Sequence, residues 1–347
     1  MSVAEVIQAM PKVELHMRLE GALRKKTLLT IAEQNDIPSS TKHFDQLVEQ
    51  LDNPDFAQLD TLLHTVGSWL QHPEDLGRVV YDAGVSLARQ NVKYAEICVN
   101  TAIFMQQGLT LETLMGALND GRSRAERGWH IRINWVLTVP RAEPRRADET
   151  VRWASSAAAR RHGVVGFGIV GPENVQPIGQ FERAFAAAEK KDLSTFIQAG
   201  NVEGADGVLR TITQINPHRL LDAYSAVESP ELIDMLVERE VPVVLSARRA
   251  TAEGIIGGSS NVTKALYDAG VRLVLSSDMP SLVNASLTDE YVTAIEKGGL
   301  NLDELQEIAL NAVQCSFLSP DDKSTMLQEF RAVYEELREG PLASEAG

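Results

Sequence analysis

The residues from Pro11 to Leu23 contain a spacing that can supply part of a metal site. They read PKVELHMRLEGAL and end in a turn. Side chains alternate with period two along a β-strand, so His16 and residue 18 should lie on the same face. A histidine at both positions would form a His-x-His pair of ligands, but residue 18 is Arg18. A guanidinium is permanently charged and only donates hydrogen bonds, so this position cannot ligate a cation.

Eight short apolar runs recur along the chain, and most are separated by stretches with helical spacing. The runs are residues 13–19, 92–99, 131–139, 164–170, 194–199, 219–225, 241–247 and 271–277. Eight alternations of strand and helix predict an α/β fold, a (β/α)8 TIM barrel. A doubly wound open sheet is the main alternative, but no glycine-rich phosphate loop follows the first run.

The segment between the first two runs, residues 21–91, is long and holds several helical patterns. We expect it to be a helical insertion over the mouth of the barrel. The whole chain then forms a single barrel domain over residues 1–340, and residues 341–347 are expected to be a frayed tail.

Composition and charge narrow the class of protein. Hydrophobic residues make up 44% and charged residues 23%, which is typical of a globular protein. The net charge of −15 argues against nucleic acid and anionic membranes as partners. No run approaches the length of a membrane span, and two isolated cysteines fit a reducing cytoplasm. We expect a small-molecule partner, and homo-oligomerisation stays open.

In such barrels the chemistry lies at the carboxyl ends of the strands, which selects the positions of interest. Those positions are His16, Arg18, Glu20, Glu96, Asn100, Gly171, Glu173, Gln198, Asn201, Asp222, Tyr224, Arg248, Arg249 and Asp278. Loops after strands 7 and 8 often bind phosphate, so Arg18 and Arg248 are candidates for holding an anionic group.

Four motifs resemble those of the adenosine/adenine deaminase family within the amidohydrolase superfamily. They are residues 10–28, Tyr94–Ile97, Gly166–Glu173, and Ser276–Pro280 followed by Ser286–Tyr291. The similarity covers nearly the whole chain. It implies a barrel-shaped hydrolase whose ordinary members hold zinc with the two histidines of the first motif, a histidine after strand 5 and an aspartate after strand 8.

The chain departs from this pattern at most of the positions that carry the family's chemistry. His16 matches the first zinc ligand and Asp278 matches the last. Arg18 replaces the second ligand, and Gln198 replaces the ligand after strand 5. Asn201 stands where the family has a glutamate that donates a proton to the purine ring.

Further positions bear on the ligand. Asp222 stands where the family has its catalytic histidine, and Met279 replaces an aspartate that contacts the purine. Glu20 and Gly171 match positions that contact the nucleoside or base, so a purine-like ligand is still compatible with the sequence.

Zinc needs about four ligands, and an arginine ~4 Å away would repel it by several kcal/mol. We therefore expect no zinc cofactor, and we interpret Arg18 as a cation in the metal's place that bridges Asp278 and Asp222. The candidate catalytic residues are His16, Asp222 and Asp278. The candidate ligand-binding residues are Arg18, Glu20, Gly171, Gln198, Asn201, Met279 and Arg248.

Three functions stay open. The first is a metal-free family member that binds a small nucleoside-like or anionic ligand without zinc-dependent deamination, with room for a different acid/base reaction. The second is a non-catalytic binding or scaffold protein. The third is a zinc-dependent purine deaminase with a rearranged site, which stoichiometric zinc and adenosine turnover would identify.

Overall fold

A computed structural model describes residues 2–105, 108–257 and 261–339. The expected tail, residues 341–347, lies outside these residues. None of the described helices is both long and apolar enough to cross a membrane.

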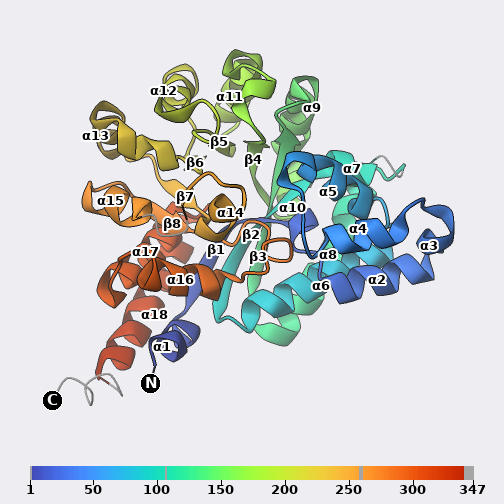
Figure 1. The fold of residues 1–347 in the computed structure, drawn as a ribbon, viewed down its shortest axis with the longest axis horizontal. Coiled ribbons are helices and arrows are strands. Elements are labelled where there is room, and N and C mark those ends of the chain that lie inside the picture. The colour runs from blue at the N-terminus through green and yellow to red at the C-terminus, as the bar shows by residue number, and fades with distance from the viewer. Residues whose placement is uncertain (1, 106–107, 258–260, 340–347) are drawn as a thin grey trace.

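Eight parallel strands form one sheet in chain order, surrounded by helices (Figure 1). The strands are β1 (Lys12–Arg18), β2 (Val92–Asn100), β3 (Arg132–Pro140), β4 (Val164–Val170), β5 (Ser194–Gln198), β6 (Arg219–Leu221), β7 (Val243–Leu245) and β8 (Leu273–Leu275). The first and last strands meet where the Arg18 amide donates to the carbonyl of Asp278 at 2.8 Å. The expected TIM barrel is thus confirmed, and each predicted run overlaps one of the strands.

The last three strands are shorter than the runs that predicted them. Each of β6, β7 and β8 has three residues, because the chain leaves the sheet early and turns into the loops of the mouth. Asp222 follows β6 directly with φ of 62°, and Asp278 lies three residues beyond β8 with φ of 50°. Left-handed backbone is uncommon for residues other than glycine, and it often marks functional turns.

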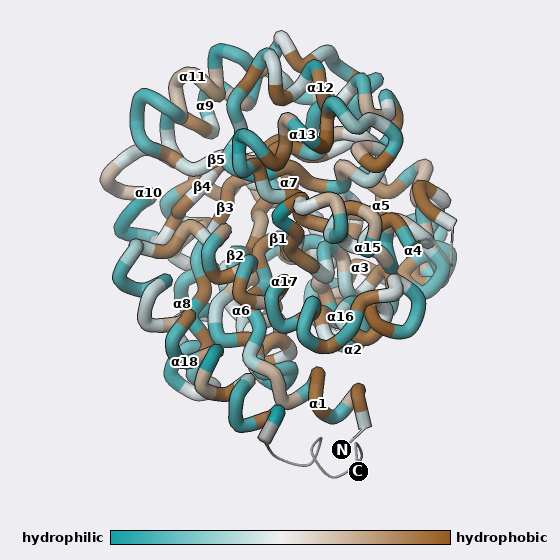
Figure 2. Tube along the Cα trace, turned by 90° about the vertical axis from the view of Figure 1, so that its left-hand side faces the viewer, coloured by the Kyte–Doolittle hydropathy of each residue, from teal (hydrophilic) through white to brown (hydrophobic). Residues whose placement is uncertain are grey.

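Burial explains why the strands read as continuous apolar runs. All seven residues of β1 are buried, as expected for a strand covered on both faces. Figure 2 shows hydrophobic segments gathered along the strands and hydrophilic segments on the outer turns of the helices.

The helices form the outer layer and the connections. They are α1 (Val3–Ala9), α2 (Lys25–Gln34), α3 (Ile37–Ser40), α4 (Phe44–Gln50), α5 (Leu59–Gly67), α6 (Pro73–Ala88), α7 (Thr101–Met105), α8 (Leu111–Trp129), α9 (Pro144–Ala154), α10 (Ala157–Arg161), α11 (Glu182–Glu189), α12 (Gly204–Gln214), α13 (Pro230–Glu238), α14 (Ala247–Ala252), α15 (Val262–Asp268), α16 (Leu287–Glu296), α17 (Leu302–Cys315) and α18 (Pro320–Glu339). Short 3₁₀ turns are η1 (Leu19–Gly21), η2 (Phe56–Gln58), η3 (Glu173–Val175), η4 (Ile178–Phe181) and η5 (Tyr224–Glu228).

The long segment between β1 and β2 has two different roles. Its last helix, α6, packs against α8 on the outside of the barrel and so acts as an ordinary crossover helix. Residues 56–61, which comprise η2 and the start of α5, instead face a cavity at the barrel mouth together with Arg18. The part of the segment that covers the mouth is therefore shorter than residues 21–91.

Candidate ligand site at the barrel mouth

Arg18, the last residue of β1, forms a two-pronged ion pair with Asp278. Its Nε lies 2.7 Å from Asp278 Oδ1, and its Nη2 lies 3.3 Å from Oδ2. Both residues are buried, at 5% and 2% exposure. Paired donors on a planar guanidinium match the geometry of a carboxylate, so the predicted contact between these two residues is formed.

A second arginine, Arg249 on α14, is the centre of the cluster. Its Nε lies 2.6 Å from Asp278 Oδ2, its Nη2 donates to Asp222, and its Nη1 donates to Glu253. The expected bridge from Arg18 to Asp222 is therefore wrong. Arg249 makes that bridge, because its side chain reaches both carboxylates from the end of β7.

The expected role of Arg248 is not supported by its position. It is half-buried, and its backbone amide donates to Glu290 at 3.1 Å. The cavity at the mouth is lined by Arg249 instead. Helix α14 begins at Ala247, and neighbouring residues of a helix point about 100° apart, so one of the two arginines faces the mouth and the other does not.

Two amide side chains connect the cluster to neighbouring loops. Gln198, at the end of β5, accepts from the amide of Gly171 at 2.8 Å and donates to Asp222 at 2.9 Å. Asn201 Nδ2 lies 3.4 Å from Asp222, while its buried Oδ1 has no hydrogen-bond partner among the described residues. Gly171 has φ of 109°, a conformation that favours glycine.

His16 lies below the ion pairs and is 4% exposed. Its Nε2 is 3.4 Å from Asp278 Oδ1, and its Nδ1 is 3.2 Å from the sulfur of Cys98. Burial raises the pKa of the Cys98 thiol well above its usual range, so the thiol keeps its proton beside this ring nitrogen.

Two other predicted ligand residues have different environments. Glu20 on η1 is 3% exposed, and its Oε2 has no partner among the described residues. Met279 is fully buried against Gly21, where an added Cβ would lie 2.4 Å from the methionine Cγ. Met279 is thus a packing residue and not a wall of the cavity.

Burial and ion pairing shift the pKa values of these carboxyl groups in different directions. Burial disfavours the charge of Asp278, but Arg18 and Arg249 outweigh it and hold the pKa of Asp278 well below its usual range. Burial raises the pKa of Asp222 and of Glu253 despite the nearby Arg249. Burial also raises the pKa of Glu20 to about 7.

The ion pairs open onto a cavity of about 450 Å³, within the size range of small-molecule sites. Polar groups of the cluster line its floor, and the insertion supplies Phe56, Leu59 and Asp60 to its wall. The lining residues are Arg18, Phe56, Ala57, Gln58, Leu59, Asp60, Thr61, Gly171, Pro172, Gln198, Asn201, Val202, Arg249, Glu253 and Ile255. Neither Arg249 nor the residues of the insertion were selected from the sequence as ligand-binding residues.

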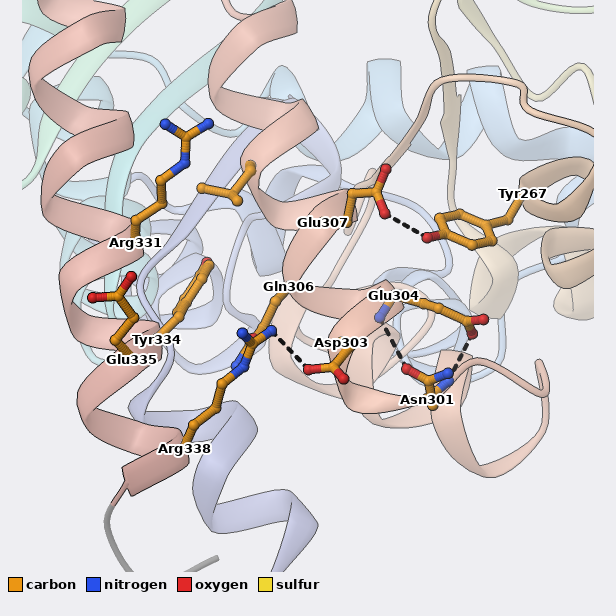
Figure 3. Close-up of a pocket in the computed structure, with 11 residues that line it drawn as sticks. Tyr267, Asn301, Asp303, Glu304, Gln306, Glu307, Arg331, Tyr334, Glu335 and Arg338 are labelled. Atoms are coloured by element: carbon orange, nitrogen blue, oxygen red, sulfur yellow. Dashed lines mark hydrogen bonds and ion pairs between the residues drawn. The ribbon is translucent and has the colours of Figure 1, made fainter.

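Another cavity of similar volume lies on the outside of the barrel, among α15, α17 and α18 (Figure 3). Its polar side chains pair with one another: Tyr267 with Glu307, and Arg338 with Asp303. It is far from the strand ends that carry the cluster, so the mouth is the better candidate for a functional site.

The residues at the mouth do not fit the zinc ion that the family resemblance implies. Among the described residues, no group of three or more His, Cys, Asp and Glu side chains is arranged to hold a metal ion. His16 and Asp278 are close together, but each oxygen of Asp278 faces a guanidinium. A structural or catalytic zinc site needs at least three protein ligands and tolerates no fixed cation in their midst.

Comparisons with known proteins agree with the fold and the motifs. Residues 11–333 match the family described as adenosine deaminase. Over 327 residues the chain is 28% identical to an aminodeoxyfutalosine deaminase of Streptomyces avermitilis, covering 93% of this chain and 91% of that protein.

Solved structures show the same fold. An amidohydrolase from Burkholderia ambifaria with bound Zn has a TM-score of 0.87 at 22% identity, covering 97% of this chain and 95% of that one. Arabidopsis ADAL complexed with GMP has a TM-score of 0.82 at 23% identity, covering 94% and 98%. The chain described here belongs to the adenosine deaminase family.

Proposed function

We propose that this chain binds a small nucleoside-like ligand at the barrel mouth and does not perform zinc-dependent deamination. One observation carries the proposal: Arg18 and Arg249 hold Asp278 between them at the floor of an open cavity of about 450 Å³. Two arginines pair with the aspartate that matches the family's last zinc ligand, and a pocket lies beside them.

The loss of zinc chemistry follows from the charges around Asp278. A zinc ion that approached this carboxylate would meet two guanidiniums that already form ion pairs with it. Zinc enzymes lower the pKa of a bound water towards 7, and this supplies the hydroxide that attacks the ring. Asn201 replaces the family's proton-donating glutamate, and an amide cannot deliver a proton.

The shape and lining of the cavity support a flat, partly apolar ligand. Phe56, Leu59 and Ile255 form apolar surface beside the polar amides of Gln198 and Asn201. Such a mixture is typical of pockets for heterocyclic molecules. Relatives named adenosine deaminase and adenine deaminase, and the ADAL structure with GMP, are consistent with a ligand of this class.

The anionic alternative is less well supported by the ion pairs. All three nitrogens of Arg249 already face carboxylates, and Arg18 directs two of its nitrogens at Asp278. If the chain has an acid/base reaction of its own, His16 is the group to transfer the proton, because Asp222 and Asp278 are held in ion pairs.

Two measurements on the purified protein test the proposal. Elemental analysis of protein prepared without chelator should find zinc well below one equivalent. Thermal-shift titration with adenine and adenosine should raise the melting temperature, since a ligand that binds the native state stabilises it. Stoichiometric zinc with adenosine turnover would overturn the proposal, as would the absence of any shift with either compound.

A pair of variants links binding to the mouth. Phe56→Ala removes apolar wall surface and should weaken nucleoside binding with little effect on folding. Val237→Ala, at an exposed position of α13, is the matched control and should leave binding unchanged. Equal binding by both variants would place the ligand elsewhere.

A further inference from the structure

The barrel mouth contains more carboxylates than guanidiniums. Three carboxyl groups, those of Asp222, Asp278 and Glu253, form ion pairs with the two guanidiniums of Arg18 and Arg249. When all three are ionised, the cluster carries one negative charge in excess, because three carboxylates face two cations.

Two neighbouring charged residues, Arg141 and Glu173, do not change this balance. Arg141 is buried and donates to the carbonyls of Gln176 and Gln198. Glu173 is buried beside it and accepts from the backbone amides of Val202 and Glu203. One positive and one negative charge are added, so the excess at the mouth stays negative.

The unpaired negative charge is accessible from the cavity. Glu253 uses Oε2 for Arg249, while its Oε1 has no hydrogen-bond partner among the described residues. Asp60, on the insertion, is exposed, lines the same cavity and forms no ion pair within the described part of the chain. Both carboxylates are available to a ligand that enters from solvent.

A further acceptor lies beside the cavity. The Oδ1 of Asn201 is buried and has no hydrogen-bond partner in the described part of the chain, and Asn201 lines the cavity. A buried acceptor without a hydrogen bond is costly, so a ligand N–H group that reaches it gains free energy. This acceptor and the free carboxylate oxygens can each accept a hydrogen bond from a ligand.

We propose, building on the proposed function, that the ligand of the mouth is a cation: a nucleoside-like ring that carries an amine protonated at neutral pH. The ring packs against Phe56 and Ile255, and the ammonium group pairs with Glu253 and Asp60. An anion would have to compete with Asp222 and Asp278 for guanidiniums that are already bonded, whereas a cation disturbs none of these ion pairs.

A series of three ligands with one ring tests this directly. Adenosine is neutral, 5′-amino-5′-deoxyadenosine is a cation at pH 7, and AMP is a dianion. Isothermal titration at pH 7 should show the amine binding about tenfold more tightly than adenosine, and AMP more weakly than adenosine. Raising the salt from low to high concentration should reduce the advantage of the amine, because exposed charges are screened.

Variants assign the effect to the two carboxylates. Glu253→Gln and Asp60→Asn should each lower the ratio of the amine's affinity to that of adenosine, measured on the same variant. Glu238→Gln and Asp234→Asn, on the distant helix α13, are the matched controls and should keep the full preference. Circular dichroism of each variant establishes that it folds.

The outcomes separate this inference from the proposed function. If adenosine binds but the amine gains nothing, or if AMP binds most tightly, the inference is wrong and the proposed function stands. If none of the three compounds binds, both are overturned.

Discussion

Buried ion pairs occur at both ends of this barrel, and they differ in what surrounds them. Where β6 begins, Arg219 donates to Glu96, and these residues are 1% and 0% exposed. The backbone amide of Phe317 and the hydroxyl of Tyr94 also donate to Glu96, and the Phe317 ring lies 3.6 Å from the Arg219 guanidinium. This pair is enclosed by protein, and its one positive charge matches its one negative charge.

The pairs at the mouth are also buried, but they adjoin a cavity and their charges do not balance. Arg18 and Arg249 face more carboxylates than they can neutralise, and both arginines line a cavity open to solvent. The same chemical contact therefore serves the fold at one end and leaves charge available for a ligand at the other. Four experiments test this contrast.

Arg219→Met should have the largest effect. It leaves Glu96 charged and buried without a cation, which costs about 3–5 kcal/mol of unfolding free energy. Urea denaturation measures this loss. Arg132→Met is the control, because Arg132 pairs with Asp322 at the surface and its side chain is 48% exposed. The control should lose less than ~1 kcal/mol, and equal losses would show that enclosure does not matter.

Arg249→Met should cost less, about 2–4 kcal/mol, because water from the cavity can solvate the freed carboxylates. Without the guanidinium, the pKa of Asp222, which burial already raises, should rise further, whereas Asp278 keeps its pair with Arg18. A group with a raised pKa in the folded state stabilises at low pH, and this stability is lost as pH increases. The defect should therefore be smaller at pH 5 than at pH 7, and a loss independent of pH would contradict this account.

Lys12→Met tests the end of the barrel where the strands begin, by measuring how stability depends on pH. Lys12 is buried and donates to the carbonyls of Ile7 and Met10, and burial lowers its pKa from 10.5 to about 7. Between these values the unfolded chain binds a proton that the folded chain does not, so stability should rise with pH, by at most ~1.4 kcal/mol per unit. Urea titrations at pH 7 and 8.5 should show this rise in the parent and not in the variant.

Glu20→Gln tests the barrel mouth. Here the stability of the parent should change with pH in the opposite direction to the Lys12 effect and by the smallest total amount. Burial raises the pKa of Glu20 from 4.5 to about 7, so the folded chain holds a proton that the unfolded chain has lost within this window. Stability should fall as pH rises from 4.5 to 7, again by at most ~1.4 kcal/mol per unit, over a narrower pH range than for Lys12. The variant should lack this decline; a parent whose stability does not decline there would place Glu20 in a charged, solvated state.

The sequence was sufficient for the barrel because its signals are local. Runs of buried residues and the helices between them repeat along the chain, and each of the eight runs overlaps one strand of the structure. The pair formed by Arg18 and Asp278 was also predictable. They lie at the ends of the first and eighth strands, and those strands must be neighbours when a barrel closes.

The sequence could not predict which arginine pairs with Asp222 and Asp278. Arg248 and Arg249 are equivalent in type and adjacent in sequence, and the choice between them depends on where α14 begins after β7 ends at Leu245. Glu253 follows Arg249 by four residues, so the same helical phase brings it to the same guanidinium.

The sequence by itself determined the architecture and the replacement of the family's metal ligands, since both depend on residue type and strand position. Only the tertiary structure decided that Arg249 is the bridging cation and that Asp60 and Phe56 face the cavity. These choices depend on helix phase and on how a segment between the first two strands folds back over the mouth. Such contacts join residues far apart in the chain, and no local pattern encodes them.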